Sequence, residues 1–308
     1  MAKIWEQYPG YNLAHAYSRI ITRSCFRSVR IEGLERIPRE GAVLLAPNHC
    51  ATLMDPMVAL LLSKDPIAFG ARSDIFANPR IGRILRWLRI VPIARERNGL
   101  SEVAKNLDTF EEISDCLAHE VPFCLYAEGT HRPERGMLPV KKGIFRIARL
   151  AHEELGKPVK IVPIGADYEY FFRGQGRLAV RIGEPLEISE AFNRDPSVPE
   201  AKVFRDLCTD LQERILALIG RLPERRHGQR LLRCLAVLPS LPLFAVCAAG
   251  ALPIWLPYLL IMRKMKDKAW SHTVRFVLHL VLPVFIPFHI FYERLLNFYR
   301  NLAEDLRS

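Results

Sequence analysis

A histidine and an aspartate that could act together in proton transfer lie early in the chain. His49 follows the apolar segment 42–46, and Asp55 comes six positions later. Imidazole titrates near neutral pH, and a carboxylate on its other ring nitrogen fixes the tautomer and stabilises the imidazolium. Such a base contributes about 10² to 10⁴ in rate. A histidine capped by an aspartate is also common as a purely structural feature, so the pair alone leaves both interpretations open.

The neighbouring thiol does not suggest a protein nucleophile. Cys50 follows His49 directly, but no residue pattern around it indicates an activated thiolate, and no serine nucleophile motif accompanies the pair. A base at His49 would therefore have to deprotonate the substrate itself.

A second polar cluster follows the apolar segment 123–127. Glu128, Gly129 and Thr130 form a turn there, and Arg132 comes two positions after it. Backbone N–H groups, a hydroxyl and a guanidinium are groups that bind an anion. The cluster predicts an anion site at a strand end.

Two further sets of cations could serve the same anion. Arg95 and Arg97 follow the strand-like segment 90–94, and Lys142 opens a helix. A helix N-terminus attracts phosphate through its free N–H groups and its dipole. Taken alone, the pair of arginines is better explained as a solvated charge patch than as an anion site.

Between residues 29 and 220, short apolar runs alternate with amphipathic helices. This alternation predicts an α/β sheet covered by helices on both faces, with functional residues where strands end and loops begin. Strands are expected at 29–33, 42–46, 67–70, 90–94, 123–127, 159–165 and 178–188, and helices at 55–62, 78–88, 101–119, 142–155 and 199–219.

The C-terminal part, residues 223–308, contains two long uncharged runs. Residues 234–262 and 276–292 carry no charged side chain, and a short basic turn, 263–268, lies between them. A bilayer core needs about 20 apolar helical residues, or as few as ~17. We therefore expect a membrane-associated helical hairpin. A helical hairpin buried in a soluble core is the alternative, and because six prolines interrupt the runs, a broken, re-entrant or interfacial hairpin is another.

The N-terminal segment, residues 1–28, is predicted to be an amphipathic helix close to the membrane. Arg19, Arg23 and Arg27 follow at i, i+4 spacing among aromatic and aliphatic residues, and the segment has no signal-peptide pattern. A helix packed on the globular domain would show the same pattern.

Composition and charge narrow the classes of partner. The chain has 308 residues, of which 50% are hydrophobic, and 44 Lys and Arg against 33 Asp and Glu give a formal net charge of +11. Such a basic, apolar chain fits an anionic membrane surface. Lys and Arg do not interleave with aromatic residues as in sheets that bind RNA, so no nucleic acid is expected. Seven cysteines without CxxC or Cys/His ligand spacing argue against a disulfide scaffold or a zinc site and are typical of reduced thiols in a cytosolic compartment.

The order of these motifs resembles that of the PlsC-like glycerolipid acyltransferase superfamily. That superfamily has an Asn-His block followed by Asp, a Pro-Ile-x-Arg block, a Pro-Glu-Gly-Thr-Arg block and a Val-Pro-Ile block. The resemblance covers about residues 30–190. The matching residues are Asn48-His49 with Asp55, Pro92-Ile93-Ala94-Arg95, Glu128-Gly129-Thr130 and Val162-Pro163-Ile164-Gly165.

The chain departs from the family pattern at three points. Five residues, rather than the usual four, separate His49 from Asp55, so the turn between them must differ. His131 stands where the family commonly has arginine, and Arg132 comes one position later, which leaves open which of them meets the phosphate. Ala127 replaces the common proline.

The resemblance implies a fold, an activity and roles for individual residues. The implied fold is a mixed sheet flanked by helices, with the acyltransferase domain at 29–222. The implied reaction moves an acyl group from acyl-CoA or acyl-carrier protein to the free hydroxyl of a lysophospholipid, with 1-acyl-glycerol 3-phosphate as the leading acceptor and phosphatidate as product. No acyl-enzyme, metal or redox cofactor is implied. The implied roles are His49 as base, Asp55 as its orienting partner, Glu128, Gly129 and Thr130 around the acceptor, and Arg95, Arg97, Arg132 and Lys142 as candidates to neutralise its phosphate.

Other functions fit the same residues. Within the class, the acceptor could be glycerol 3-phosphate or another lyso-lipid, including an amino-acid lipid without phosphate. Outside it, the chain could be a non-catalytic protein that binds membrane lipid, although a binder has no need of a base. An enzyme that joins a bilayer substrate to an anionic thioester is expected on the cytoplasmic face of the plasma (inner) membrane.

Overall fold

The fold is built on one mixed β-sheet. The computed structural model describes residues 3–6, 8–93, 100–188, 198–222 and 230–307. Strands follow one another across the sheet in the order β1-β7-β6-β2-β5-β3-β4, and β8 pairs with β6. The pairs β6–β7 and β6–β8 are antiparallel, whereas the other pairs are parallel. The strands are β1 (Ser28–Glu32), β2 (Ala42–Pro47), β3 (Ala68–Arg72), β4 (Ile90–Ile93), β5 (Phe123–Cys124), β6 (Val159–Tyr168), β7 (Arg177–Ile182) and β8 (Leu186–Glu187).

The central strand β2 is buried along its whole length because helices cover both faces of the sheet. Successive side chains of a strand point to opposite faces. Ala42, Leu44 and Ala46 accordingly pack in one hydrophobic cluster, and Val43 and Leu45 in the other. A strand that is buried on both faces has a continuous apolar sequence, and the apolar segment 42–46 was predicted to be such a strand.

Two sets of helices form these layers. Helices α4, α5 and α7 contribute to the first cluster, and α1, α2 and α10 to the second. The helices of the sheet region are α1 (Tyr11–Ser24), α2 (Met54–Ala59), α3 (Pro79–Trp87), α4 (Leu100–Ala118), α5 (Gly143–Leu155) and α7 (Glu200–Leu218). The predicted mixed sheet flanked by helices is confirmed.

Two predicted strands are shorter than expected. The ladder of β5 ends at Cys124, although the segment was expected to continue to 127, because the chain turns there into the loop that contains Glu128. The predicted strand 178–188 is divided into β7 and β8, and Pro185, which has no N–H to donate, lies in the break.

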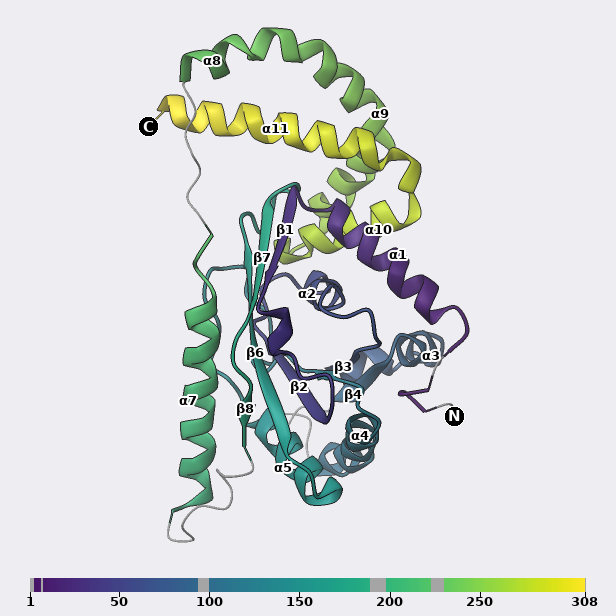
Figure 1. The fold of residues 1–308 in the computed structure, drawn as a ribbon. Coiled ribbons are helices and arrows are strands. Elements are labelled where there is room, and N and C mark those ends of the chain that lie inside the picture. Colours follow the sequence, from purple (N-terminus) through teal and green to yellow (C-terminus); the bar gives the residue numbers. More distant parts are fainter. Residues whose placement is uncertain (1–2, 7, 94–99, 189–197, 223–229, 308) are drawn as a thin grey trace.

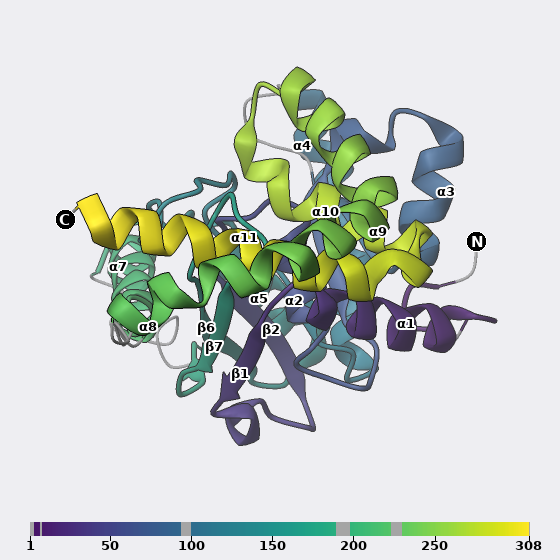
Figure 2. The same ribbon diagram turned by 90° about the horizontal axis from the view of Figure 1, so that it is seen from above.

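The C-terminal helices lie over the end of the sheet where β2 ends (Figures 1 and 2). They are α8 (Arg230–Leu235), α9 (Val237–Lys264), α10 (Ser271–Val281) and α11 (Ile286–Arg307). One helix among the described residues, α9, is long and apolar enough to cross a membrane, and only 17% of its apolar window is buried.

The second apolar run is not a straight helix. It is broken at Leu282, before Pro283, into α10 and α11, which are bent by 108°. Much of α10 packs against the sheet domain, and its Arg275 forms a buried ion pair with Glu293 of α11 at 2.6 Å. The second run is therefore broken, as its prolines suggested, but the expected interruption of the first run is wrong: α9 is continuous from Val237 to Lys264 although three prolines lie inside it.

Helix α1 packs on the sheet domain with one face and exposes the other. Tyr11, His15 and Ile21 are buried, and the helix contacts α2 and α10. Leu13 and Ile20 point outward and are 76% and 65% exposed. The predicted row of three arginines is not complete on this helix, because α1 ends at Ser24 and Arg27 lies just before β1, and part of the apolar surface of the helix is not used by the fold.

Candidate active site

The centre of the site is an ion pair at the end of β2. His49 Nδ1 lies 2.7 Å from Asp55 Oδ2. The Asp55 side chain is buried at 2% exposure, whereas that of His49 is 18% exposed. With Nδ1 donating to the carboxylate, the neutral ring carries its lone pair on Nε2, and no described residue is hydrogen-bonded to that atom. The pair predicted from the sequence is therefore formed, with the free nitrogen available to a ligand.

The turn between the two residues accommodates the extra position noted in the sequence. Thr52 adopts a left-handed conformation, with φ 51°, and α2 begins two residues later. A left-handed residue reverses the chain within a short segment. Asp55 returns to His49 and also accepts the N–H groups of Cys50 at 2.9 Å and Ala51 at 2.7 Å.

A tyrosine that the sequence did not single out completes the shell of Asp55. Tyr168 ends β6, which pairs with β2, and its hydroxyl donates to Asp55 Oδ1 at 2.6 Å. Burial, together with the charge of Asp55, raises the pKa of Tyr168 well above its usual value of 10. The hydroxyl therefore stays protonated and remains a donor. No local motif reveals this contact, because 113 positions separate the two residues.

Asn48 joins the same two strands. Its side chain exchanges two hydrogen bonds with the backbone of Ala166, at 3.1 and 2.7 Å. The residue is buried at 2% exposure. Asn48 fixes the end of β2 against β6. Because His49 is the next residue, this contact also fixes the position of the His49 backbone.

Glu128 braces the loop that carries His49. It is 2% exposed, and its carboxylate accepts the backbone N–H of His49 at 2.6 Å and of Leu138 at 2.5 Å. Burial raises the pKa of Glu128, and these two hydrogen bonds oppose that shift. Both oxygens are thus engaged by the backbone, so Glu128 shapes the site by holding the chain rather than by offering an oxygen to a ligand.

Aromatic rings surround the exposed edge of His49. Tyr126 lies 4.4 Å from it, centroid to centroid, and His131 lies 5.5 Å away in an edge-on arrangement. His131 Nε2 is in turn 2.8 Å from Asp267 Oδ2, in the turn that precedes α10. The position where the family commonly has arginine is therefore used here for a contact with the C-terminal segment.

A second contact from the C-terminal segment reaches the turn after His49. The hydroxyls of Thr52 and Thr273, on α10, are 2.8 Å apart and buried. Together with the pair His131–Asp267, it attaches the C-terminal helices to the loops on either side of the His49 ring.

The predicted anion-binding residues are distributed around this centre. Arg132 is exposed and donates its backbone N–H to the carbonyl of His49 at 3.1 Å. Gly129, with φ 73°, and Thr130 are exposed in the same loop. Lys142 is the exposed N-cap of α5.

Three further basic residues belong to the segments predicted to bind the anion. Arg95 and Arg97 lie outside the described residues. Lys141, the neighbour of Lys142, donates its backbone N–H to Ala127 O at 2.8 Å and so adjoins the turn at Gly129.

The residues described do not offer a second kind of chemistry at this site. The thiol of Cys50 is buried, and burial together with the charge of Asp55 raises its pKa well above 9. A thiol held protonated in this way is a poor nucleophile. Within the described ranges, no group of three or more His, Cys, Asp and Glu side chains could hold a metal ion.

Comparisons with known proteins agree with this geometry. Residues 28–167 match a family model described as Acyltransferase. A curated 1-acyl-sn-glycerol-3-phosphate acyltransferase of Bacillus subtilis (strain 168) is 22% identical over 196 residues, which are 64% of this chain and 90% of the relative. The crystal structure of the 1-acyl-sn-glycerophosphate (LPA) acyltransferase PlsC from Thermotoga maritima matches with a TM-score of 0.50 and 19% identity, over 70% of this chain and 81% of that chain. The structural match shows a shared fold.

The fold, the order of the motifs and the family match define an acyltransferase domain. Residues 28–167 match that family model, and the chain is similar to PlsC-like glycerolipid acyltransferases, which its sequence motifs also resemble.

Proposed function

We propose that the protein transfers an acyl group from acyl-CoA or acyl-carrier protein to the free hydroxyl of a lysophospholipid, with 1-acyl-glycerol 3-phosphate as the acceptor and phosphatidate as the product. The observation that carries the proposal is the 2.7 Å contact between His49 Nδ1 and Asp55 Oδ2, with no hydrogen bond from a described residue to the opposite nitrogen of the ring. Acylation of glycerol 3-phosphate or of another lyso-lipid uses the same base and is decided by the experiment below.

The chemistry requires only the base and two substrates. His49 Nε2 takes the proton of the acceptor hydroxyl as that oxygen attacks the thioester carbonyl. Asp55 stabilises the imidazolium that forms. The tetrahedral intermediate then collapses, the C–S bond breaks, and the thiolate leaves and recovers the proton from the imidazolium. No acyl-enzyme is formed on this route.

The positions of the cations support a phosphorylated acceptor. Arg132 is bonded through its backbone to the carbonyl of His49, and Lys142 caps α5, whose N-terminus adds the positive end of a helix dipole. We propose that these two, with Arg95 and Arg97, neutralise the acceptor's phosphate. Gly129 and Thr130 would contribute the backbone N–H groups and the hydroxyl of an anion-binding turn.

The membrane supplies one of the two substrates. An exposed apolar helix, α9, and a formal net charge of +11 suit a protein that works at an anionic lipid surface. We propose that the catalytic domain lies on the cytoplasmic face, where the thioester donors are found.

The test is product analysis by mass spectrometry with the purified full-length protein in lipid vesicles. Isotope-labelled acyl-CoA and acyl-carrier protein are each offered with 1-acyl-glycerol 3-phosphate, glycerol 3-phosphate and a lyso-lipid without phosphate. We expect phosphatidate from wild type, and a loss of about 10² to 10⁴ in kcat for His49→Ala. His152→Ala, which removes a histidine on α5 away from the site, serves as the matched control.

Two outcomes would contradict the proposal. Equal turnover by wild type and His49→Ala would remove His49 as the base, and no product from any acceptor would favour a non-catalytic lipid-binding protein. Intact-protein mass after incubation with the donor alone checks the mechanism, because an acyl adduct would show that a covalent intermediate forms.

A further inference from the structure

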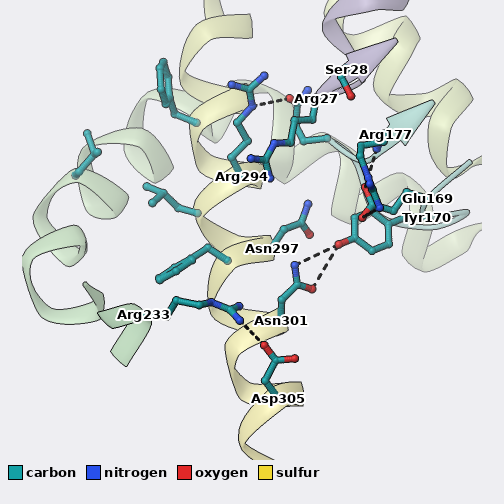
Figure 3. Close-up of a pocket in the computed structure, with 15 residues that line it drawn as sticks. Arg27, Ser28, Glu169, Tyr170, Arg177, Arg233, Arg294, Asn297, Asn301 and Asp305 are labelled. Carbon is teal, nitrogen blue, oxygen red and sulfur yellow. Dashed lines mark hydrogen bonds and ion pairs between the residues drawn. The ribbon is translucent and has the colours of Figure 1, made fainter. Parts of the chain in front are cut away.

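A cavity with charged and apolar walls lies away from His49, between α11 and the sheet edge formed by β1 and β7. Its volume is about 830 Å³, and Figure 3 shows the side chains that line it. None of the lining residues belongs to the cluster of His49, Asp55, Tyr168 and Glu128. The proposed acyl transfer does not involve this cavity. The residues that line the cavity therefore have another role.

The lining carries an excess of positive charge. Four arginines and two acids face the cavity, and each acid already has an arginine partner: Glu169 pairs with Arg177 at 3.2 Å, and Asp305 with Arg233. No carboxylate partner is found among the described residues for the other two, Arg27 and Arg294. Two like charges brought to one cavity repel each other unless an anion joins them.

Arg294 is held through its side chain before any ligand arrives, and Arg27 is held through its backbone. The Nε–H of Arg294 donates to Gln175 Oε1 at 3.0 Å, and Gln175, buried at 3% exposure, donates to Ser24 O at 2.6 Å. Arg27 donates its backbone N–H to Gly176 O at 2.9 Å, next to Gln175. The terminal nitrogens of Arg294 remain for a ligand, and Figure 3 places both arginines on the same side of the cavity. A preorganised pair loses little entropy on binding.

The other wall of the cavity is apolar. Phe291, Leu295 and Phe298 follow at i, i+4 and i+7 spacing on α11, and Leu243 faces them from α9. Leu243 and Phe291 are 52% and 53% exposed. The cavity therefore has a cationic side at the sheet edge and a hydrophobic side that continues onto the helix suited to a membrane.

We propose that this cavity binds an anionic phospholipid, with its phosphate between Arg27 and Arg294 and its acyl chains along the apolar face of α11 and α9. Guanidinium groups form strong charge-assisted hydrogen bonds with phosphate oxygens. A soluble anion would use the arginines but not the phenylalanines, whereas a phospholipid matches both walls. The site is independent of the proposed acyl transfer, because it lies outside the residues that transfer requires.

The test is native mass spectrometry of the full-length protein released from nanodiscs that contain equal amounts of phosphatidylglycerol and phosphatidylcholine. The variant carries Arg27→Gln and Arg294→Gln together. We expect wild type to retain one phosphatidylglycerol in preference to phosphatidylcholine, and the variant to bind it about 30-fold more weakly, since each arginine contributes about 1 kcal/mol toward an anionic lipid.

A control separates the site from the overall charge. The double variant Arg39→Gln and Arg205→Gln removes the same two charges from exposed arginines outside the cavity, on the loop before β2 and on α7. It is expected to retain the lipid as wild type does. Thermal unfolding of all three proteins checks that the variants fold, and because the readout is bound lipid, it does not depend on turnover.

Three results would overturn the proposal. Equal loss of lipid in both double variants would show that lipid binding depends on the total charge of the protein and not on this cavity. Equal retention of phosphatidylcholine would show that the arginines select nothing. Displacement of the bound lipid by inorganic phosphate or by CoA would show that the cavity takes a soluble anion.

Discussion

Asp55 has more hydrogen-bond partners than its role toward His49 alone requires. Its Oδ2 accepts from the His49 ring and from two backbone N–H groups, and its Oδ1 accepts from the Tyr168 hydroxyl. A buried carboxylate must have its lone pairs satisfied if it is to stay charged. The four donors thus hold the Asp55 carboxyl group beside the His49 ring, where the proposed mechanism needs it.

The hydroxyl of Tyr168 can be removed without changing the shape of the site. For Tyr168→Phe we expect kcat to fall about 10-fold with little change in KM, because a hydrogen bond to a charged group contributes about 1.5 kcal/mol. The residue positions Asp55 and does not touch the acceptor, so the loss belongs in kcat. Steady-state kinetics with varied acceptor checks this, and Tyr17→Phe, whose hydroxyl bonds Leu280 O outside the site, is the control.

A rise in KM alone would contradict this assignment, because it would place Tyr168 in acceptor binding. The double variant Tyr168→Phe with Asp55→Asn provides a further check. If Tyr168 acts through Asp55, Tyr168→Phe lowers kcat much less in the Asp55→Asn variant than in wild type.

The residues that the sequence could predict are those joined by short stretches of chain. His49 and Asp55 lie six positions apart, within one strand-to-helix turn, so their spacing already indicates contact. Tyr168 reaches the site only because β6 pairs with β2, which no local pattern encodes. The sequence also could not predict that the Glu128 carboxylate accepts two backbone N–H groups. These contacts depend on how the loop folds back on His49.

At the scale of elements, the C-terminal helices and the turn before α10 contact the loops on either side of His49. Helix α10 contacts both α1 and α2, and Thr273 on α10 meets the left-handed Thr52 in the turn between His49 and Asp55. A non-glycine residue in this conformation stores backbone strain, of order 1–3 kcal/mol, and persists only where the surroundings hold it. The threonine pair supplies one such contact.

Replacing Thr273 with valine tests this coupling between elements. Thr273→Val keeps the side-chain volume but removes the hydroxyl, and we expect it to lower kcat about 5- to 10-fold because the turn after His49 loses a buried hydrogen bond of about 1 kcal/mol. Thr209→Val, on the exposed face of α7, removes a hydroxyl outside the site and should leave kcat unchanged.

Thermal unfolding distinguishes a local from a global effect of Thr273→Val. If kcat falls in proportion to the folded fraction, the hydroxyl serves stability alone. If kcat is unchanged while the protein is fully folded, α10 does not position the turn, and the coupling is refuted.

The sequence predicted the elements best where one periodicity continues without interruption. The buried strand β2 and the helix α4 lie within one residue of the expected segments. The run 276–292 was harder, because uncharged composition does not distinguish lipid contact from protein contact. Buried His279 and His289 bond to each other within it at 2.8 Å, which shows that part of this run faces protein.

For the whole molecule, the exposed apolar helix α9 and the pair His49–Asp55 lie at one end of the sheet. The exposed helix α9 lies over the end of the sheet at which β2 ends (Figures 1 and 2), and His49 follows β2 closely in the chain. A surface of this kind places an active site at the boundary between lipid and water, where an acceptor in the bilayer and a donor in the cytosol meet. We propose that the membrane binds this end of the molecule.

Three leucines on one face of α9 provide the decisive test of that orientation. Leu252, Leu256 and Leu259 are 44%, 41% and 51% exposed and follow at i, i+4 and i+7. Replacing all three with glutamine should weaken vesicle binding at least about 100-fold, because about 1 kcal/mol of apolar transfer is lost at each partly exposed site. Flotation of the purified protein with phosphatidylglycerol vesicles, in 0.1 M and 0.5 M salt, measures the effect.

The matched control places the same substitutions on the sheet domain. Leu34, Leu150 and Leu216 are 45%, 38% and 40% exposed, so Leu→Gln at these positions removes a similar apolar surface away from α9. If both triple variants leave the vesicles, the effect comes from general loss of hydrophobicity, and if neither does, α9 does not bind the membrane. If only the α9 variant loses vesicle binding, at both salt concentrations, an apolar helix anchors the end of the molecule at which His49 lies. High salt screens the electrostatic attraction between the basic protein and the vesicle but not the hydrophobic contact.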